Sequence, residues 1–349
     1  MSLVDDLVGL IRVPSVTGEE EALCTLLARR LSPRFGADAL VRIGNSLVVG
    51  RPTGNPLITL YGHLDTVPEQ ENLEPRVEGG RVFGLGASDM KSGLAVMLGL
   101  LEDGAPAATR YDVAGVFYDR EEGPAADNGL EEVLDSVPWL SSAALAVVLE
   151  PTDLRVELGC QGAINATVSF LGAAAHSARP WLGENAVTRA APWLMEMAAR
   201  LPERVSVGGL EYHETFTVTT ATAGVAPNVV PPRFDLNLNY RFPPDRTPAQ
   251  AEARVREVAA AADEVVIVDL APAAPVPGSN PHLDRLVEAS GGDPRGKQAW
   301  TDVARLAARG IPAVNYGPGE AAQAHTSGES VAIANLEAAF EVLHRFLAS

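Results

Sequence analysis

The stretch LITLYGHLDTVP, residues 57–68, shows a pattern that recurs along the first half of the chain. It begins as a short apolar run, typical of a buried strand, and ends in polar residues that include His63 and Asp65. Similar β-rich runs, each bounded by Gly, Pro, Asn or Asp, occupy residues 40–49, 112–118 and 144–149. Segments with helical periodicity occupy residues 5–11, 19–31 and 91–101. This alternation predicts an α/β domain with a mixed, largely buried sheet and helices on both faces.

A different order of elements begins near Cys160. We expect strand, helix, strand, strand, helix and strand over residues 162–171, 184–201, 214–223, 233–241, 248–262 and 264–270. This βαββαβ order is the ferredoxin-like split pattern. A Pro/Ala-rich linker precedes further helix and strand patterns, which occupy residues 282–290, 302–309, 311–315 and 332–347. That last part is too short for a third domain, so we expect residues 1–160 plus 273–349 to form one domain into which residues 161–272 are inserted.

The composition excludes several classes of protein. The chain has 349 residues and a net charge of −18, which would repel nucleic acid and an anionic membrane surface. No apolar run reaches the roughly 18 residues of a membrane span, and the N-terminus has no pattern of a signal peptide. Two cysteines are too few for a disulfide framework. We therefore expect a cytoplasmic protein with two reduced thiols and a small-molecule ligand.

Acidic and imidazole side chains gather where the predicted strands end. Open α/β sheets bind ligands outside the carboxyl ends of their strands. The candidates, at strand ends or in loops beside them, are His63, Asp89, Glu121, Glu122, Glu150 and His325. So many carboxylates converge in one cleft only if cations neutralise them, and the absence of thiolates favours a two-metal site with zinc, cobalt or manganese. Asp65, two residues after His63, would orient the imidazole.

Taken one at a time, these residues have ordinary structural explanations. Asp89 can cap the helix that follows it, and a Glu pair usually faces solvent. The combined pattern favours a metal site over these separate explanations. Other site types lack their motifs: Gly84 and Gly86 are not followed by the third glycine of a dinucleotide fingerprint, and neither GxxxxGK[ST] nor GxSxG occurs.

Four segments resemble a known family. YGHLDTVP (61–68), GLGASDMKSGLAVML (84–98), EEG (121–123) and AHTSGE (324–329) are similar to signature segments of the dinuclear-zinc amidohydrolases that include aminoacylase and carboxypeptidase G. The resemblance implies a zinc-dependent catalytic domain with two Zn²⁺ per subunit. His63 and Glu150 would hold one ion and Glu122 and His325 the other. Asp89 would bridge the two ions, and Glu121 would be the general base.

The resemblance also implies roles for the inserted domain, as a lid and dimerisation domain. His176 would reach the active site of the partner in a homodimer, and Arg179, Asn228 and Arg241 match positions that contact substrate carboxylates. Within the family, residues 149–187 look most like the Gram-positive succinyl-diaminopimelate desuccinylases, which implies hydrolysis of an N-acyl diamino acid in diaminopimelate and lysine biosynthesis. Acetylornithine deacetylase or another N-acyl amino acid amidohydrolase or peptidase stays an alternative. A non-catalytic metal-binding scaffold is a third.

Overall fold

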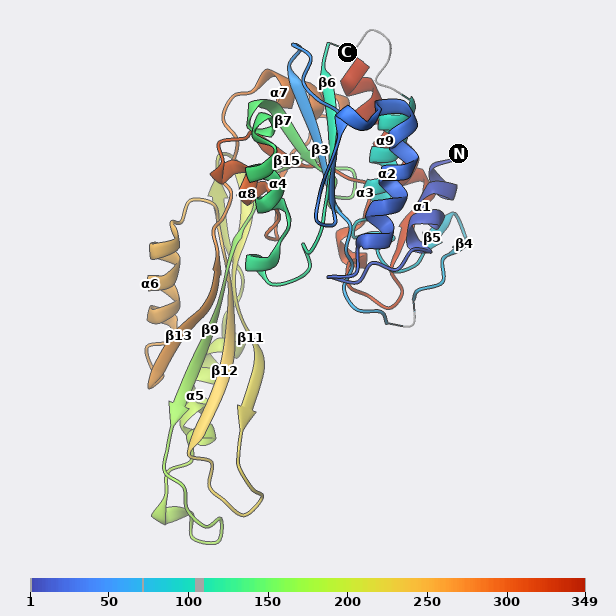
Figure 1. Ribbon diagram of the computed structural model, residues 1–349. Coiled ribbons are helices and arrows are strands. Elements are labelled where there is room, and N and C mark those ends of the chain that lie inside the picture. The colour runs from blue at the N-terminus through green and yellow to red at the C-terminus, as the bar shows by residue number, and fades with distance from the viewer. Residues whose placement is uncertain (1, 71, 104–109, 349) are drawn as a thin grey trace. The chain divides into compact units, whose positions relative to one another are not determined.

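The computed structural model of the protein describes residues 2–70, 72–103 and 110–348. By its internal contacts the chain forms two compact units (Figure 1). The first contains the chain up to Leu158, Pro277–Arg295 and the chain from Thr301 onward, and the second contains Gly159–Val276 with Gly296–Trp300. The sequence pattern assigned residues 296–300 to the first unit. They pack with the second because the Gln298 side chain donates to the Glu211 carbonyl at 2.8 Å and accepts from the His213 N–H at 2.9 Å.

An eight-stranded mixed sheet forms the centre of the first unit, in the order β1-β2-β6-β3-β7-β15-β8-β14. Its strands are β1 (Leu40–Ile43), β2 (Ser46–Val49), β3 (Leu57–His63), β6 (Asp112–Tyr118), β7 (Ala143–Val148), β8 (Glu157–Leu158), β14 (Arg295–Gly296) and β15 (Ala313–Asn315). β3 runs parallel to β6 and β7, so their carboxyl ends lie at one edge. The β-rich run at residues 40–49 forms two strands, because a turn at Gly44 and Asn45 folds it into the antiparallel pair β1 and β2.

Helices cover both faces of this sheet, as predicted. They are α1 (Leu3–Ile11), α2 (Glu21–Phe35), α3 (Lys91–Asp103), α4 (Leu130–Ser136), α7 (Pro281–Ala289), α8 (Val303–Ala308) and α9 (Ile333–Ala348). Figure 1 shows α2 and α3 on one side of the sheet and α4 on the other. A side chain at Gly93 would place its Cβ 2.5 Å from the Leu149 carbonyl oxygen. Glycine at this position therefore lets the start of α3 approach the end of β7.

The first unit also contains a small antiparallel sheet. It consists of β4 (Arg76–Glu78), β5 (Arg81–Phe83) and β16 (Ser330–Ala332), in the order β16-β5-β4. The sequence analysis did not predict these three strands, because each has three residues and no distinct alternation. Their pairing connects the loop before α3 with the chain just after His325. Among the helices of the described residues, none combines the length and apolar character that crossing a membrane requires.

The second unit contains a five-stranded antiparallel sheet in the order β10-β11-β12-β9-β13. Its elements are β9 (Gly162–Leu171), α5 (Ala186–Ala199), β10 (Glu203–Val207), β11 (Leu210–Ala223), β12 (Arg233–Phe242), α6 (Pro248–Val258) and β13 (Glu264–Ala271). The order of β11, β12, β9 and β13 confirms the ferredoxin-like prediction. β10 is an addition that the analysis missed. Gly208 and Gly209, with φ of 59° and 82°, form the tight turn that joins β10 to β11.

Candidate metal centre

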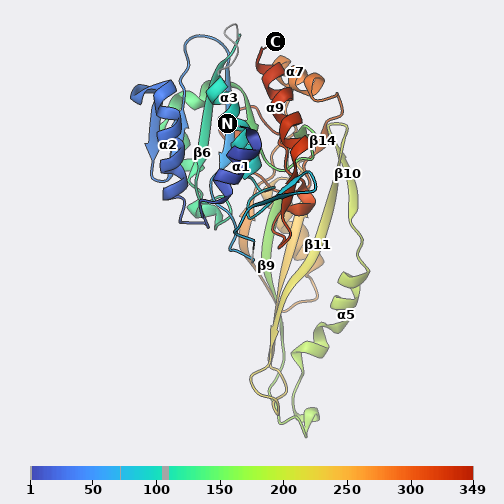
Figure 2. The ribbon, with the colours of Figure 1, turned by 90° about the vertical axis from the view of Figure 1, so that its right-hand side faces the viewer.

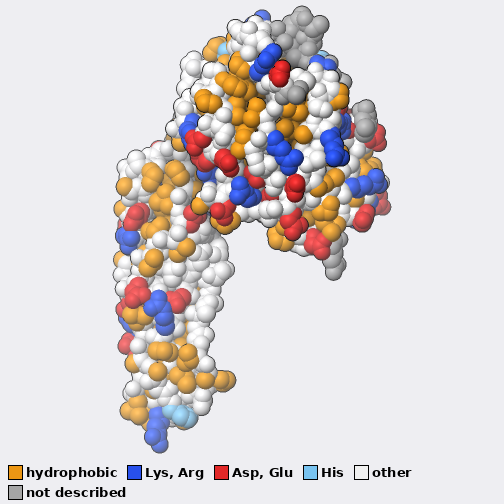
Figure 3. Space-filling view, viewed as in Figure 1, with side chains coloured by type: hydrophobic (Ala, Val, Ile, Leu, Met, Phe, Trp, Pro, Cys, Tyr) orange, Lys and Arg blue, Asp and Glu red, His pale blue; other side chains and the backbone are white. Residues whose placement is uncertain are grey.

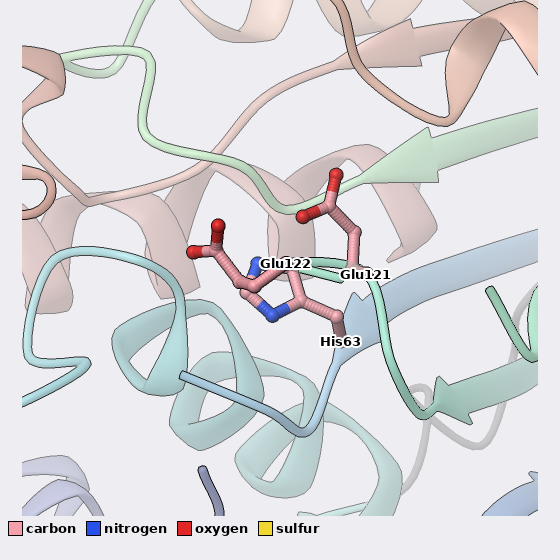
Figure 4. Close-up of side chains that lie close together, drawn as sticks. All are labelled: His63, Glu121 and Glu122. Carbon is pink, nitrogen blue, oxygen red and sulfur yellow. The ribbon is translucent and has the colours of Figure 1, made fainter. Parts of the chain in front are cut away.

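The carboxyl ends of three neighbouring strands deliver the first candidate ligands. His63 is the last residue of β3, the pair Glu121 and Glu122 follows β6, and Glu150 follows β7. Figure 4 shows the His63 ring close to the carboxylates of Glu121 and Glu122. Two loops complete the group. Asp89 precedes α3, and His325 precedes β16.

Three overlapping groups of residues could each hold a metal ion. Within each group, one ligand atom from every residue lies within 4.8 Å of the others. The groups are His63 with Asp89 and Glu150, Asp89 with Glu122 and His325, and His63 with Glu121 and Glu122. Asp89 belongs to two groups: Oδ1 is 3.2 Å from His63 Nε2, and Oδ2 is 3.6 Å from His325 Nε2. The structure therefore brings together all six candidates that the sequence placed at strand ends or in loops beside them. Carboxylate oxygens and imidazole nitrogens without a thiolate fit zinc, cobalt or manganese.

The electrostatics of the cluster favour divalent cations. Burial raises the pKa of Glu121 well above its ordinary value, and repulsion from Glu150 and Glu122 adds to the effect while His63 opposes it. Burial lowers the pKa of His63, but contacts with Asp65 and Asp89 overcome this, and the net shift is upward. The Glu121 carboxylate therefore holds a proton more readily than an ordinary glutamate unless positive charge is supplied. Cations in the cluster would supply that charge.

Asp65 binds the Glu pair as well as facing the imidazole. Its carboxylate accepts the backbone N–H groups of Glu121 and Glu122, each at 2.9 Å, and the hydroxyl of Thr17 at 2.9 Å. Its Oδ1 lies 3.6 Å from His63 Nδ1, whereas the Asp65 carbonyl oxygen lies 3.0 Å from the same nitrogen. Burial opposes ionisation, but His63 and the two N–H groups lower the pKa of Asp65. Asp65 thus fixes the loop that presents Glu121 and Glu122.

The loop residue His325 makes the most exposed contribution to the cluster. Its Nε2 lies 2.9 Å from Glu122 Oε1, and 52% of its side chain is exposed. The hydrogen bond with Glu122 raises the pKa of His325 to about 9, against the effect of burial. Its backbone has φ of 60°, in the left-handed region, where non-glycine residues cost about 1 kcal/mol or more and cluster at functional sites. The surrounding contacts hold the imidazole toward Glu122.

Glu329 supports the centre, although the sequence analysis gave it no role. It is 2% exposed, and its carboxylate accepts the backbone N–H groups of Gly86, Ser88 and Asp89, each at 2.8 Å. Burial raises the pKa of Glu329 to about 7, and the three N–H groups oppose that shift. Its position four residues after His325 was visible in the quoted AHTSGE segment. Its partners, about 240 positions away in the chain, were not.

Asp302 is a second buried carboxylate that the sequence analysis missed. It is 0% exposed, lies 2.8 Å from the Arg305 Nε and accepts the Asn128 amide at 3.1 Å. Its charge contributes to raising the pKa of Glu121. Arg120, by contrast, lies beside the Glu pair in sequence but directs its guanidinium to Asp119 at 3.3 Å.

The remaining candidates lie in the second unit and fall into two places. His176 forms a β-bridge with Val229, and the Ser177 N–H donates to the Asn228 carbonyl at 2.9 Å, so His176, Arg179 and Asn228 share one exposed loop region. Arg241 lies eight residues beyond the first residue of β12, about 26 Å along the strand at 3.3 Å per residue. One copy of this unit therefore does not bring Arg241 to the His176 loop.

Fold and site together define a metal-dependent hydrolase class. Residues 59–349 match peptidase family M20/M25/M40, a metal-dependent family, and the chain belongs to it. Curated relatives point to one activity within the family. A Corynebacterium glutamicum protein named succinyl-diaminopimelate desuccinylase is 34% identical over 97% of this chain and 94% of its own length. A Mycobacterium tuberculosis protein that carries the name DapE is 39% identical over 97% of this chain and 96% of its own length.

Solved structures agree on the fold. A tripeptidase from Staphylococcus aureus has a TM-score of 0.80 and 21% identity, covering 99% of this chain and 97% of its own. The aminopeptidase PepT from Bacillus cereus has a TM-score of 0.76 and 19% identity, with the same coverage. At these identities the likeness describes the fold alone.

Proposed function

We propose that this chain hydrolyses the amide bond of N-succinyl-LL-2,6-diaminopimelate. The observation that carries the proposal is the sharing of Asp89 by two ligand groups, in a chain 34% and 39% identical over nearly its whole length to two relatives that carry the desuccinylase and DapE names. In the reaction, the oxygen of water forms a bond to the acyl carbon and the acyl C–N bond breaks. The amine takes up a proton, and the products are succinate and diaminopimelate.

Five residues would hold two metal ions. His63 and Glu150 would hold the first, Glu122 and His325 would hold the second, and Asp89 would be shared by both. When bound, such a pair of ions acidifies water and withdraws charge from the acyl oxygen. Zinc is the ion we propose, and cobalt or manganese suits the same donors.

Glu121 moves the proton. Its carboxylate is desolvated, which raises its pKa and makes it a better proton acceptor than an ordinary glutamate. It takes a proton from the attacking water and delivers it to the leaving amine nitrogen. The hydrogen bond from its backbone N–H to Asp65 holds the main chain at Glu121 in place.

His176, Arg179, Asn228 and Arg241 bind the substrate in this proposal. The Ala178 N–H donates to His176 Nδ1 at 3.0 Å, so the neutral imidazole carries its proton on Nε2 and can donate it to the acyl oxygen as charge develops there. Arg179 and Asn228 lie in the same loop region as His176 and would bind the substrate beside it. Arg241, at the other end of β12, meets a substrate carboxylate separately.

The separation of Arg241 from the His176 loop supports a homodimer through the second unit, with His176 acting in the partner's active site. Subunit mixing tests this. Glu121→Gln and His176→Ala homodimers should each be inactive, and equal mixing should restore about one quarter of wild-type activity, because half of the dimers are mixed and each has one complete site. No recovery in mixed dimers that are shown to form would refute action in trans.

The test of the reaction itself is succinate release. Purified wild-type protein should release succinate from N-succinyl-LL-2,6-diaminopimelate with a kcat/KM well above that for N-acetylornithine. Chelation should abolish the release, and zinc should restore it. Glu121→Gln should bind metal and lack activity, since its change leaves the five ligands in place. Equal or faster cleavage of N-acetylornithine would refute the proposed substrate.

A further inference from the structure

A chain of hydrogen-bonded amides crosses one face of the sheet in the second unit. On β12 the apolar side chains, such as Leu236 and Leu238, are buried in the core with α5 and α6. Figures 1 and 2 show α5 alongside this sheet. Because side chains alternate along a strand, Asn237, Asn239 and Arg241 point to the opposite face. In Figure 3, the side of this unit that carries β11 is largely white, without a charged or apolar patch.

The chain of hydrogen bonds ends at Arg241. Its Nε donates to Asn239 Oδ1 at 3.1 Å, and Asn239 Nδ2 donates to Asn165 Oδ1 at 2.9 Å. The same Asn165 oxygen accepts from Asn237 Nδ2 at 3.1 Å. An arginine only donates, so Asn239 must turn its oxygen to Arg241 and its amino group to Asn165. Each amide therefore has one orientation, set by its neighbour.

Arg241 differs from most arginines of this chain. Within the described residues, fifteen others, such as Arg233 and Arg246, pair with a carboxylate, whereas no carboxylate lies within 4.0 Å of the Arg241 guanidinium. The guanidinium is half-buried. Burial lowers the pKa of Arg241, and the negative charge of Asp269, which makes no ion pair with it, opposes that shift. A partly desolvated cation without an anionic partner is costly. The two terminal nitrogens are suited to a bidentate carboxylate.

We propose that Asn239, oriented by Asn165, is the positioning residue that turns the Arg241 guanidinium toward a carboxylate of the substrate. This rests on the proposed function, in which Arg241 meets such a carboxylate. Asn239 holds Nε, so both terminal nitrogens stay directed at the ligand. The carboxylate belongs to either the succinyl arm or the diamino acid arm, and the experiment distinguishes them.

The test compares Asn239→Ala with Asn237→Ala. Asn237 lies on the same strand and face and donates to the same Asn165 oxygen, but it does not touch Arg241, so it is a matched control. Kinetics are measured on N-succinyl-LL-diaminopimelate, on the N-acetyl analogue without the acyl carboxylate, and on N-succinyl-1,5-diaminopentane, which lacks both carboxylates of the diamino acid arm. Asn239→Ala should lower kcat/KM for the full substrate about tenfold, mainly through KM. Asn237→Ala should change it less than twofold.

The analogues identify the arm. The one that lacks the carboxylate met by Arg241 should respond equally little to both variants, while the other analogue should lose as much with Asn239→Ala as the full substrate does. Equal losses for the two variants, or an Asn239→Ala loss that is the same on all three substrates, would overturn the inference. Melting temperatures of both variants should match within about 2 °C, which excludes a general loss of folding.

A binding measurement keeps this inference separate from the proposed function. If the wild-type protein releases no succinate, the proposed function fails. Calorimetric titration of the wild type and both variants with succinate and with LL-diaminopimelate then decides the inference. Weaker binding by Asn239→Ala than by Asn237→Ala supports it, and equal binding, or no binding by the wild type, overturns it.

Discussion

Replacement of Glu329 should weaken both the fold and the metal centre. Glu329→Ala removes three hydrogen bonds from the backbone N–H groups of Gly86, Ser88 and Asp89, each 2.8 Å long. A hydrogen bond to a charged group contributes about 1.5–3 kcal/mol. Burial raises the pKa of Glu329 to about 7, so desolvation offsets part of this gain and the lower figure applies. We expect a loss of about 4 kcal/mol for Glu329→Ala. Glu329→Gln should lose about 1–2 kcal/mol, because an amide keeps one oxygen.

The assay has two readouts. Thermal unfolding should show a fall in Tm of about 8–16 °C for Glu329→Ala, at 2–4 °C per kcal/mol for a unit of this size. Metal content after dialysis should fall as well, because the loop that Glu329 holds presents Asp89 to both ligand groups. Glu341→Ala, an exposed change on α9, serves as the control and should alter neither. An unchanged Tm together with wild-type metal content in Glu329→Ala would refute the reasoning.

Three further predictions follow from single residues. Asp65→Asn should lower kcat about 10–100-fold with little change in KM, measured by succinate release, because one N–H of the Glu pair loses its acceptor. Burial raises the pKa of Asp112, but hydrogen bonds from Thr53 lower it, and the net shift is downward. The ionised carboxylate therefore stabilises the fold above about pH 4, and this stabilisation is lost as the pH falls further. Between pH 6 and pH 3, urea unfolding should show a smaller fall in the free energy of unfolding for Asp112→Asn than for wild type. Burial raises the pKa of the Cys24 thiol to about 11, and Cys160 is equally buried, so a thiol reagent at pH 8 should label neither in the native protein and both in urea.

The sequence was sufficient for the architecture and for the residue types of the site. Alternating apolar runs predicted the α/β unit, and the βαββαβ order predicted the ferredoxin-like sheet, because the periods of strands and helices are local properties of the chain. His63 and Glu150 could be identified because each follows a recognisable strand. Short strands such as β16 were not predicted, since three residues are too few to show the two-residue alternation of a strand.

The supporting contacts needed the folded chain. Asp65 accepts hydrogen bonds from N–H groups 56 and 57 positions away in the chain, and Glu329 accepts them from N–H groups about 240 positions away. The Asn165 side chain accepts a hydrogen bond from Asn239, 74 positions away. A hydrogen bond depends on distances of about 3 Å and on direction, and packing alone sets these between remote segments.

Local patterns in the chain therefore predicted the candidate metal ligands and the elements that carry them. Three features became visible only in three dimensions. They are the sharing of Asp89 by two candidate ligand groups, the hydrogen bonds by which Glu329 holds the Asp89 loop, and the absence, among the residues that the structure describes, of a carboxylate beside Arg241. They arise from long-range packing, in which each side chain's charge and hydrogen bonds are completed by residues that no local pattern specifies.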